Sequence, residues 1–256
     1  MRVKALGAYG GQMPGKNNTA FLVNGELLID AGTIGLALSI KEQRGIRAAL
    51  ISHAHADHIG ALPFLAVNIT SNKAPGVVIA GAAEPVKAIE EHLLNGKLWP
   101  DFTKITNAAG NPVFSYQVLK KDKWQDVAGY RVMAVKVNHT VPTTGFIAGK
   151  GKEYFVYSGD TKDTDKIWEK AAKLGKKIKA VFAEVSYPDR LSEFADLTAH
   201  LTPFSLVKQL EKLKGLKPKV YTYHLKPEYE KEIAAELKKI KGFNIKPAAE
   251  GVVYKI

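Results

Sequence analysis

The chain has 256 residues, of which 46% are hydrophobic and 24% charged, and its formal net charge is +12. These are ordinary values for a globular protein, so the composition excludes disorder as the main description, and the length is ample for a multi-layer core. The absence of cysteine from the sequence excludes disulfide scaffolds, thiolate zinc sites and thiol nucleophiles together.

The sequence indicates neither a membrane segment nor a secretion signal. No uninterrupted apolar run approaches the roughly 18–20 residues that cross a bilayer, and the start of the chain lacks the apolar core of a signal peptide. We therefore expect a cytoplasmic protein with no membrane partner. The basic charge attracts anions such as nucleotides. The lysines do not alternate with aromatic residues in a stacking pattern, so a nucleic-acid partner is not indicated.

Strand-like and helical patterns alternate along the chain without a linker or an internal repeat, which predicts a single domain over residues 1–256. Apolar strand-like runs cover residues 2–8, 19–23, 27–30, 48–52, 76–80, 130–137, 153–157, 180–185, 220–223 and 251–254. Helical patterns cover residues 85–94, 163–174, 203–213 and 227–240. Many strands with helices to cover them predict a layered α/β or α+β fold.

Three of the seven histidines fall within six residues, at His53, His55 and His58, with Asp57 among them. A buried strand-like run precedes this cluster and the start of a helix or turn follows it, which is where ligands collect in open α/β sheets. The imidazoles would repel one another if protonated, and would be unsatisfied if buried and neutral. A bound metal resolves both problems, so the cluster predicts a metal site.

Further along the chain, three polar residues each follow an apolar strand-like run. They are His139, Asp160 and His224. One such residue is more often structural than metal-bound, but three in one chain, alongside the histidine cluster, favour a shared metal centre.

The pattern His53-x-His55-x-Asp57-His58, followed by His139, Asp160 and His224, resembles the metallo-β-lactamase-fold hydrolases, as does the earlier Asp30-Ala31-Gly32. The resemblance implies a four-layer αββα sandwich with two divalent metal ions, usually zinc, with manganese or iron as alternatives. It implies that His53, His55 and His139 bind the first metal and that Asp57, His58 and His224 bind the second. Asp160 would bridge the two metals, and Asp30 would orient ligands without binding metal.

Four further stretches resemble the class II 3′,5′-cyclic-nucleotide phosphodiesterases within that superfamily. They are Leu94–Thr103, Glu184–Asp189, His200–Pro203 and His224–Pro227. The resemblance implies hydrolysis of cyclic AMP or cyclic GMP to the 5′-monophosphate by a metal-bound hydroxide. The expected catalytic residues are His200, Glu184 and Asp57, with His200 as the general acid that protonates the leaving ribose oxygen and Glu184 as its orienting carboxylate.

Three other functions stay open at this point. A tRNA-processing nuclease fits the charge, but the 21 positions between His139 and Asp160 leave no room for the long arm that such enzymes carry. A β-lactam, thioester or lactone hydrolase would give Glu184 and His200 no role. A non-catalytic metal-binding module is disfavoured by the complete ligand set.

Several residues near these motifs have no assigned role. His92 is expected to be a solvent or core histidine, and Trp99, Phe102 and Tyr187 are expected to pack in the core, with base stacking as the alternative. The short connections between motifs suggest that loops enclosing the base are reduced. A homodimer could complete those walls, and the sequence leaves that open.

Overall fold

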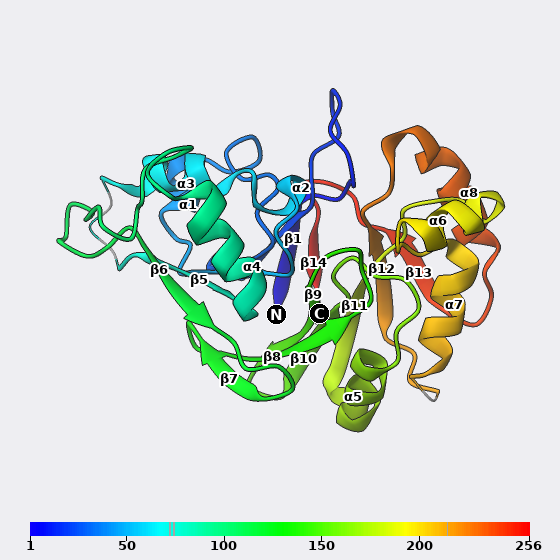
Figure 1. Cartoon of the computed structure of the whole chain (residues 1–256). Helices are drawn as coiled ribbons and strands as arrows, with labels where there is room; N and C mark the ends of the chain where they lie inside the picture. Colours follow the sequence, from blue (N-terminus) through cyan, green and yellow to red (C-terminus); the bar gives the residue numbers. More distant parts are fainter. Residues whose placement is uncertain (72, 74, 214) are drawn as a thin grey trace.

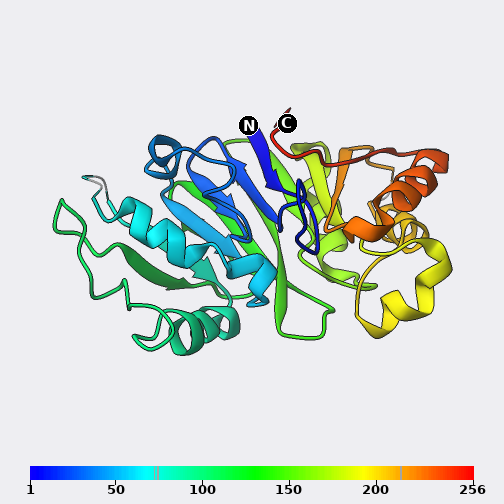
Figure 2. The same ribbon diagram turned by 90° about the horizontal axis from the view of Figure 1, so that it is seen from above.

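Two seven-stranded sheets pack face to face, and helices cover the outer face of each (Figures 1 and 2). This computed structural model describes residues 1–71, 73, 75–213 and 215–256. The layers follow the order helix, sheet, sheet, helix, so the predicted αββα sandwich is confirmed. In the described part of the chain, no helix combines the length and apolarity that crossing a membrane requires.

The first sheet contains the N-terminal strands and one strand from the far end of the chain. Its order is β14 (Val253–Lys255), β1 (Arg2–Gly7), β2 (Ala20–Val23), β3 (Leu27–Ile29), β4 (Ala48–Ile51), β5 (Val77–Gly81) and β6 (Phe114–Val118). Strands β3 to β6 are parallel, so their carboxyl ends share one edge of the sheet. The helices of this half are α1 (Ile40–Gln43), α2 (Ala56–Ile59), α3 (Leu62–Ile69) and α4 (Ala83–Ala88), and a π-helical turn, Ile89–Leu93, continues α4.

The second sheet has the order β13 (Asn244–Pro247), β12 (Lys219–Tyr223), β11 (Ile178–Glu184), β10 (Glu153–Tyr157), β9 (Thr143–Lys150), β8 (Tyr130–Val137) and β7 (Trp124–Val127). Strands β10 to β13 are parallel. The helices of this half are α5 (Lys166–Leu174), α6 (Ser192–Leu197), α7 (Pro203–Glu211) and α8 (Glu230–Lys239), with short 3₁₀ turns at Gly175–Lys177, Asp189–Leu191 and Pro227–Tyr229.

The core divides into three layers because successive side chains of a strand point to opposite faces. In β10, Phe155 and Tyr157 lie between the two sheets, whereas Tyr154 and Val156 face the outer helices. Between the sheets, Phe21 contacts the rings of Phe182 and Tyr157 at centroid distances of 5.1 and 6.1 Å. A continuous apolar run in a strand such as β10 therefore packs against the other sheet on one face and against the helices on the other.

The ten predicted strand runs all form strands, with ends that shift by no more than two residues. Strands β6, β7, β9 and β13 were missed. In β9 the reason is that Gly145 and Gly149 weaken the strand pattern. A Cβ atom at Gly145 would lie 2.5 Å from the carbonyl oxygen of Ser158, and one at Gly149 would lie 2.2 Å from that of Glu153, so close strand packing requires both glycines.

The predicted helices are present with altered ends. The run 163–174 becomes helical at Lys166, the run 203–213 ends at Glu211, and the run 227–240 begins with a 3₁₀ turn before α8. The run 85–94 is divided between α4 and the π-helical turn. The short helices α1 and α6 were missed, since four to six residues carry too little periodicity to detect.

Candidate metal centre

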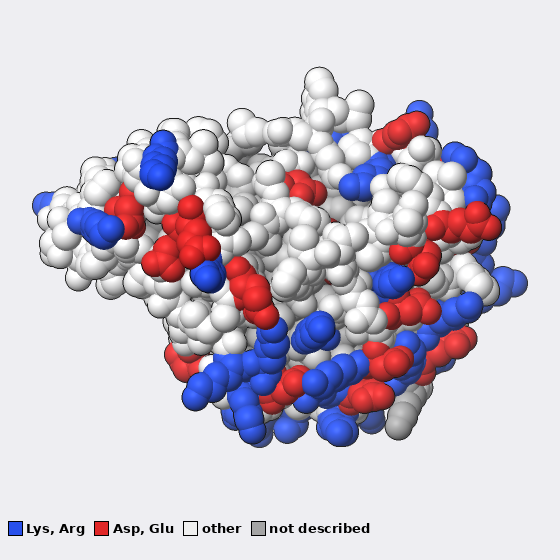
Figure 3. Space-filling model, in the orientation of Figure 1, with Lys and Arg blue, Asp and Glu red and all other residues white. Residues whose placement is uncertain are grey.

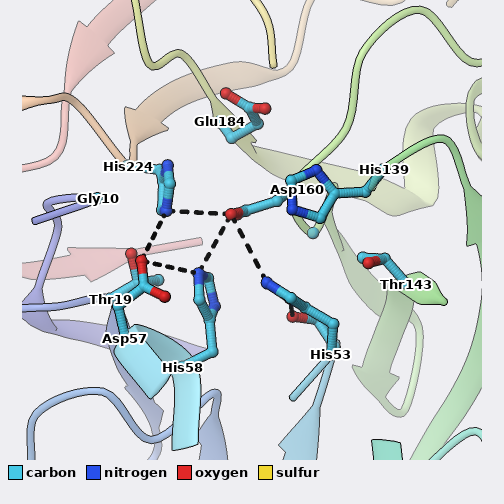
Figure 4. A network of polar contacts seen from close by, with 12 residues as sticks. Gly10, Thr19, His53, Asp57, His58, His139, Thr143, Asp160, Glu184 and His224 are labelled. Atoms are coloured by element: carbon cyan, nitrogen blue, oxygen red, sulfur yellow. Dashed lines mark hydrogen bonds and ion pairs between the residues drawn. The ribbon is translucent and has the colours of Figure 1, made fainter. Parts of the chain in front are cut away.

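The seven predicted ligand residues come together where strands of both sheets end (Figure 4). His53 follows β4, His139 follows β8, Asp160 follows β10 and His224 follows β12. His55, Asp57 and His58 come from the start of α2. Because the two sheets face each other, these ends converge on one pocket although the residues span 171 positions of sequence, from His53 to His224.

Two groups of three side chains could each hold a metal ion. His53, His55 and His139 form the first group, with ligand atoms that all lie within 4.8 Å of one another. Asp57, His58 and His224 form the second group under the same limit.

The carboxylate of Asp160 lies between the two groups. Its Oδ2 is 3.0 Å from His224 Nε2, 3.2 Å from His58 Nε2 and 3.8 Å from His53 Nε2. An oxygen in that position can contact ligands from both groups.

Several atoms at this centre are buried yet lack a hydrogen-bond partner among the described residues. They are Nε2 of His53 and His139, and Oδ1 of Asp160. Buried polar atoms are costly to leave unpaired, and most proteins pair them. Imidazole nitrogen and carboxylate oxygen are ligands that zinc, manganese and iron accept. The residues present therefore fit a pair of divalent cations.

Four of the histidines are held through the nitrogen that faces away from this centre. Nδ1 of His53 lies 3.0 Å from Ser52 Oγ, and Nδ1 of His58 lies 2.8 Å from Asp30 Oδ2. Nδ1 of His139 lies 3.0 Å from the carbonyl oxygen of Ala199, and Nδ1 of His224 lies 2.9 Å from Ser186 Oγ. Such contacts fix the ring orientation and leave Nε2 free for a cation.

The buried carboxylate of Asp30 connects residues beside the ligands. Its carboxylate accepts hydrogen bonds from the backbone N–H and the hydroxyl of Ser52, both at 2.8 Å, and from the Tyr157 hydroxyl at 2.6 Å. It also contacts His58 Nδ1. Asp30 is fully buried and contacts residues from both sheets, so its geometry suits the orienting role that the resemblance implied.

The electrostatics favour metal-competent protonation states at most of the predicted ligands. His58 is the exception, because burial lowers its pKa but the carboxylates of Asp160 and Asp30 more than offset this and raise it. Burial lowers the pKa of His53, His139 and His224, which keeps these imidazoles neutral. Burial alone would raise the pKa of Asp57, but the hydrogen bond from His224 and the nearby His58 outweigh it, and the pKa lies below its ordinary value. Neutral imidazoles and an ionised carboxylate are the forms that bind metal.

His200 and Glu184 form a pair beside the ligands. His200 Nδ1 lies 2.9 Å from Glu184 Oε1. The same oxygen accepts hydrogen bonds from the backbone N–H of Thr161 at 3.0 Å and of Leu201 at 3.3 Å. Burial lowers the pKa of His200, but the Glu184 carboxylate more than offsets this, so the pKa is raised. The His200 ring stacks on His224 at a centroid distance of 5.1 Å, which places it next to the ligands.

Two glycines allow the backbone to approach the ligands closely. A Cβ atom at Gly10 would lie 2.4 Å from Cε1 and Nδ1 of the His224 ring. A Cβ atom at Gly32 would lie 2.0 Å from the carbonyl oxygen of Asp57. No larger residue fits at either position without moving a predicted ligand.

The sequence interpretation missed the groups that orient the ligand rings, namely Ser52, Tyr157, Ser186 and the Ala199 carbonyl. Ser186 had a detectable signal, because it lies two residues after Glu184 at a strand end and can point to the same side. The Ala199 carbonyl had none, since any residue carries a carbonyl.

Of the residues without an assigned role, only Tyr187 is described in contact with the centre. His92 is exposed, and Phe102 is buried in the core. Trp99 is half-buried and packs against Phe64, whereas the Tyr187 ring meets His200 edge-on at 5.9 Å.

The sequence matches the family of the anti-Pycsar protein Apyc1 over residues 5–243. The chain belongs to this family. A Yersinia pestis protein named as a probable 3′,5′-cyclic-nucleotide phosphodiesterase is 26% identical, over 89% of this chain and 79% of the relative. A 3′,5′-cyclic-nucleotide phosphodiesterase of Aliivibrio fischeri is 28% identical, over 84% of this chain and 76% of the relative.

Solved structures share the fold. Unliganded yeast PDE1 superposes with a TM-score of 0.83 at 20% identity, over 98% of each chain. The metallo-β-lactamase-fold protein YhfI of Bacillus subtilis superposes with a TM-score of 0.78 at 17% identity, over 99% of each chain. The predicted resemblance is thus confirmed, and the chain is a metal-dependent hydrolase with the metallo-β-lactamase fold.

Proposed function

We propose that this protein hydrolyses 3′,5′-cyclic nucleotides, with cyclic AMP and cyclic GMP as the first candidates, to nucleoside 5′-monophosphates. The observation that carries the proposal is the 2.9 Å contact between His200 and Glu184 beside the ligand cluster, because it adds a proton donor to a metal centre. The names of the Yersinia and Aliivibrio relatives support the substrate class.

In this proposal one divalent cation would be held by His53, His55 and His139. A second would be held by Asp57, His58 and His224, and Asp160 would serve both. When bound, such a pair supplies Lewis acidity toward phosphate oxygens and lowers the pKa of water. Zinc is the expected metal, with manganese and iron as alternatives for the same ligands.

His200 acts as the general acid. Glu184 holds the Nδ1–H of the ring, which orients Nε2 and stabilises the imidazolium form. From there Nε2 gives its proton to the 3′-oxygen of ribose as the bond from that oxygen to phosphorus breaks. The backbone N–H groups of Thr161 and Leu201 keep Glu184 in place, so the donor is positioned before substrate arrives.

Asp57 combines two tasks. Its Oδ2 lies 3.2 Å from His224 Nε2, and the side chain is 27% exposed, so it contacts a ligand and reaches the open side of the centre. As an ionised carboxylate it can accept a hydrogen bond from the attacking water and orient that water toward phosphorus.

An activity panel tests the proposal. Protein loaded with zinc or manganese is incubated with cyclic AMP, cyclic GMP, bis(p-nitrophenyl) phosphate, precursor tRNA and nitrocefin, and products are separated by chromatography. We expect 5′-monophosphates from the cyclic nucleotides, and loss of that product in His55→Ala. Turnover of tRNA or nitrocefin without turnover of either cyclic nucleotide would overturn the proposal in favour of the nuclease or the β-lactam hydrolase.

A further inference from the structure

A pocket of about 800 Å³ opens beside the metal centre, and Asp57 forms part of its wall. Its other walls are the loop after β1 at Gly10–Gln12, the loop after β3 at Thr33–Leu36, and the segment from α2 to α3 that ends at Phe64. The volume falls within the range of about 300–1,000 Å³ that is typical of small-molecule sites. A ligand seated at the metal centre can therefore extend into this pocket.

The mouth of the pocket is apolar although it faces solvent. Leu36 is 77% exposed and Phe64 is 59% exposed. The Phe64 ring packs against the ring of Trp99, at a centroid distance of 5.9 Å. Figure 3 shows that the surface between α3 and the loop after β1 is mostly uncharged, whereas charged side chains crowd the lower margin of this view. An exposed, fixed aromatic face beside a reactive centre suits a flat ligand.

The wall also offers polar groups. Asn18 lines the pocket, and its Oδ1 has no hydrogen-bond partner in the part of the chain that the structure describes. Gln12 lines the pocket with an exposed side chain. Apolar walls with a few amide groups are typical of sites that bind a heteroaromatic ring with a polar edge.

A second hollow, of about 450 Å³, lies on the opposite side of the ligands and has a different character. His139 and Thr143 line it, and so do three lysines, Lys121, Lys136 and Lys162, against one carboxylate, Glu84, which pairs with Lys121 at 2.8 Å. Figure 4 shows His139 and Thr143 on one side of the centre and Gly10 and Asp57 on the other. A wall with a net positive charge suits an anion better than an uncharged base.

We propose that the pocket beside Asp57 holds the nucleobase of the substrate, with the base stacked on Phe64. This inference rests on the proposed function and assigns one part of the substrate to a named surface. A phosphate at the metal centre directs the attached sugar toward Asp57, and the base then continues between Leu36 and Phe64. Phe64 is on this account a specificity-determining residue, since it touches the part of the substrate that does not react.

Phe64→Ala is the main test. With cyclic AMP, kcat/KM should fall on the order of 10- to 100-fold, mostly through KM, because a base-stacking face is lost. With the abasic analogue 1,2-dideoxyribose 3′,5′-cyclic phosphate, kcat/KM should change less than about twofold. The conservative Phe64→Trp should restore most of the loss with cyclic AMP. Equal losses with both substrates would overturn the proposal.

Phe204→Ala is the matched control. Phe204 is 61% exposed, close to the 59% of Phe64, and it lines a separate hollow with Pro203 and Val207. We expect this variant to hydrolyse both substrates at the wild-type rate. A loss equal to that of Phe64→Ala would show that removing any exposed ring harms the enzyme, and would overturn the assignment.

A binding experiment without turnover separates failure of this inference from failure of the proposed function. Adenosine, which has no phosphate, is titrated while tryptophan fluorescence is recorded, because Trp99 packs directly on Phe64. Saturable quenching that is lost in Phe64→Ala and in Trp99→Phe supports the base pocket even if no cyclic nucleotide is hydrolysed. Normal hydrolysis of cyclic AMP by Phe64→Ala, with unchanged quenching, would overturn the pocket while leaving the proposed function intact.

Discussion

Two histidines of the centre contact a carboxylate through Nδ1, His200 with Glu184 and His58 with Asp30. Burial lowers the pKa of both rings, but the neighbouring carboxylates more than offset this, so both pKa values are raised. The two rings differ at Nε2, because that of His58 lies 3.2 Å from the Asp160 carboxylate within the ligand cluster. In the proposed mechanism His200 is therefore the proton donor, and His58 is a metal ligand.

Replacing His200 by alanine should remove the proton donor and leave the metals in place. We expect the rate of cyclic-nucleotide hydrolysis to fall about 10²- to 10⁴-fold, as for other lost general acids, with unchanged metal content. Elemental analysis and steady-state kinetics measure the two quantities. Loss of metal in this variant would mean that His200 is a ligand, contrary to the role assigned.

Asp160→Ala should empty at least one metal position. The carboxylate lies within 3.8 Å of ligand nitrogens from both groups, and no other carboxylate among the described residues is placed between His53 and His224 in this way. Elemental analysis of the purified variant gives the occupancy, with Asp196→Ala as a control at an exposed carboxylate. Full occupancy would rule out the shared position of Asp160.

At the scale of single residues, the sequence indicated that the seven predicted ligand side chains would lie close together. A polar residue that directly follows an apolar strand lies at a sheet edge, and parallel strands place such residues together. The orienting partners could not be predicted in the same way. The contact between His139 and the carbonyl of Ala199 joins residues 60 positions apart and depends on how the α6 segment folds over β8.

At the scale of elements, hydrogen bonds join the loop after β1 to the loop after β12. The backbone N–H of His224 donates to the carbonyl of Ala8, and Lys226 Nζ donates to the carbonyl of Gly10 at 2.6 Å. These bonds hold the Gly10 backbone close to the His224 ring. A loop of the first sheet thus sets the position of a predicted ligand from the second.

Gly10→Ala should displace the His224 ring. The added Cβ would lie 2.4 Å from two ring atoms, and overpacking of this kind costs about 1–3 kcal/mol of stability. We expect weaker retention of metal during dialysis and a lower midpoint of thermal unfolding. Gly11→Ala is the matched control, because its Cβ would meet nothing closer than Pro227 Cδ at 3.4 Å. Equal behaviour of the two variants would contradict the proposed fit.

The elements themselves were predictable where burial produces a clear apolar run. Strands β8 and β10 match their predicted ends because most of their side chains are buried, so each is marked in the sequence by a nearly continuous apolar run. Strand β13 was missed since its residues are mostly exposed, so no apolar alternation marks it. Edge strands are formed by pairing with a neighbour, which a single sequence does not display.

On the scale of the whole molecule, the centre joins the two halves of the sandwich. The loops of the first sheet carry His53, His55, Asp57 and His58, and those of the second carry His139, Asp160 and His224. A cation that binds ligands from both sheets binds the folded chain and not the unfolded one. The single domain predicted for residues 1–256 agrees with such coupling and stays a prediction.

Removal of metal should lower the thermal stability of the whole molecule. A ligand present at 100–1,000 times its dissociation constant contributes about 3–4 kcal/mol, which corresponds to a shift of about 5–10 °C for a domain of this size. Chelation followed by calorimetry measures the shift, and added zinc should reverse it. A midpoint that does not respond to chelator in zinc-loaded protein would contradict the link between the sheets.

The buried Asp30 carboxylate has a consequence for how this enzyme can diversify. Through its contacts with Ser52, His58 and Tyr157, Asp30 connects the predicted metal ligands to the interior of the sandwich, where mutation is poorly tolerated. Outside Gly10, which must stay small beside His224, the rim at residues 11–18 and 33–36 does not share these contacts with the Asp30 carboxylate. Natural or laboratory variation confined to this rim can therefore alter which substrates bind, while the predicted metal ligands and their contacts with Asp30 stay the same.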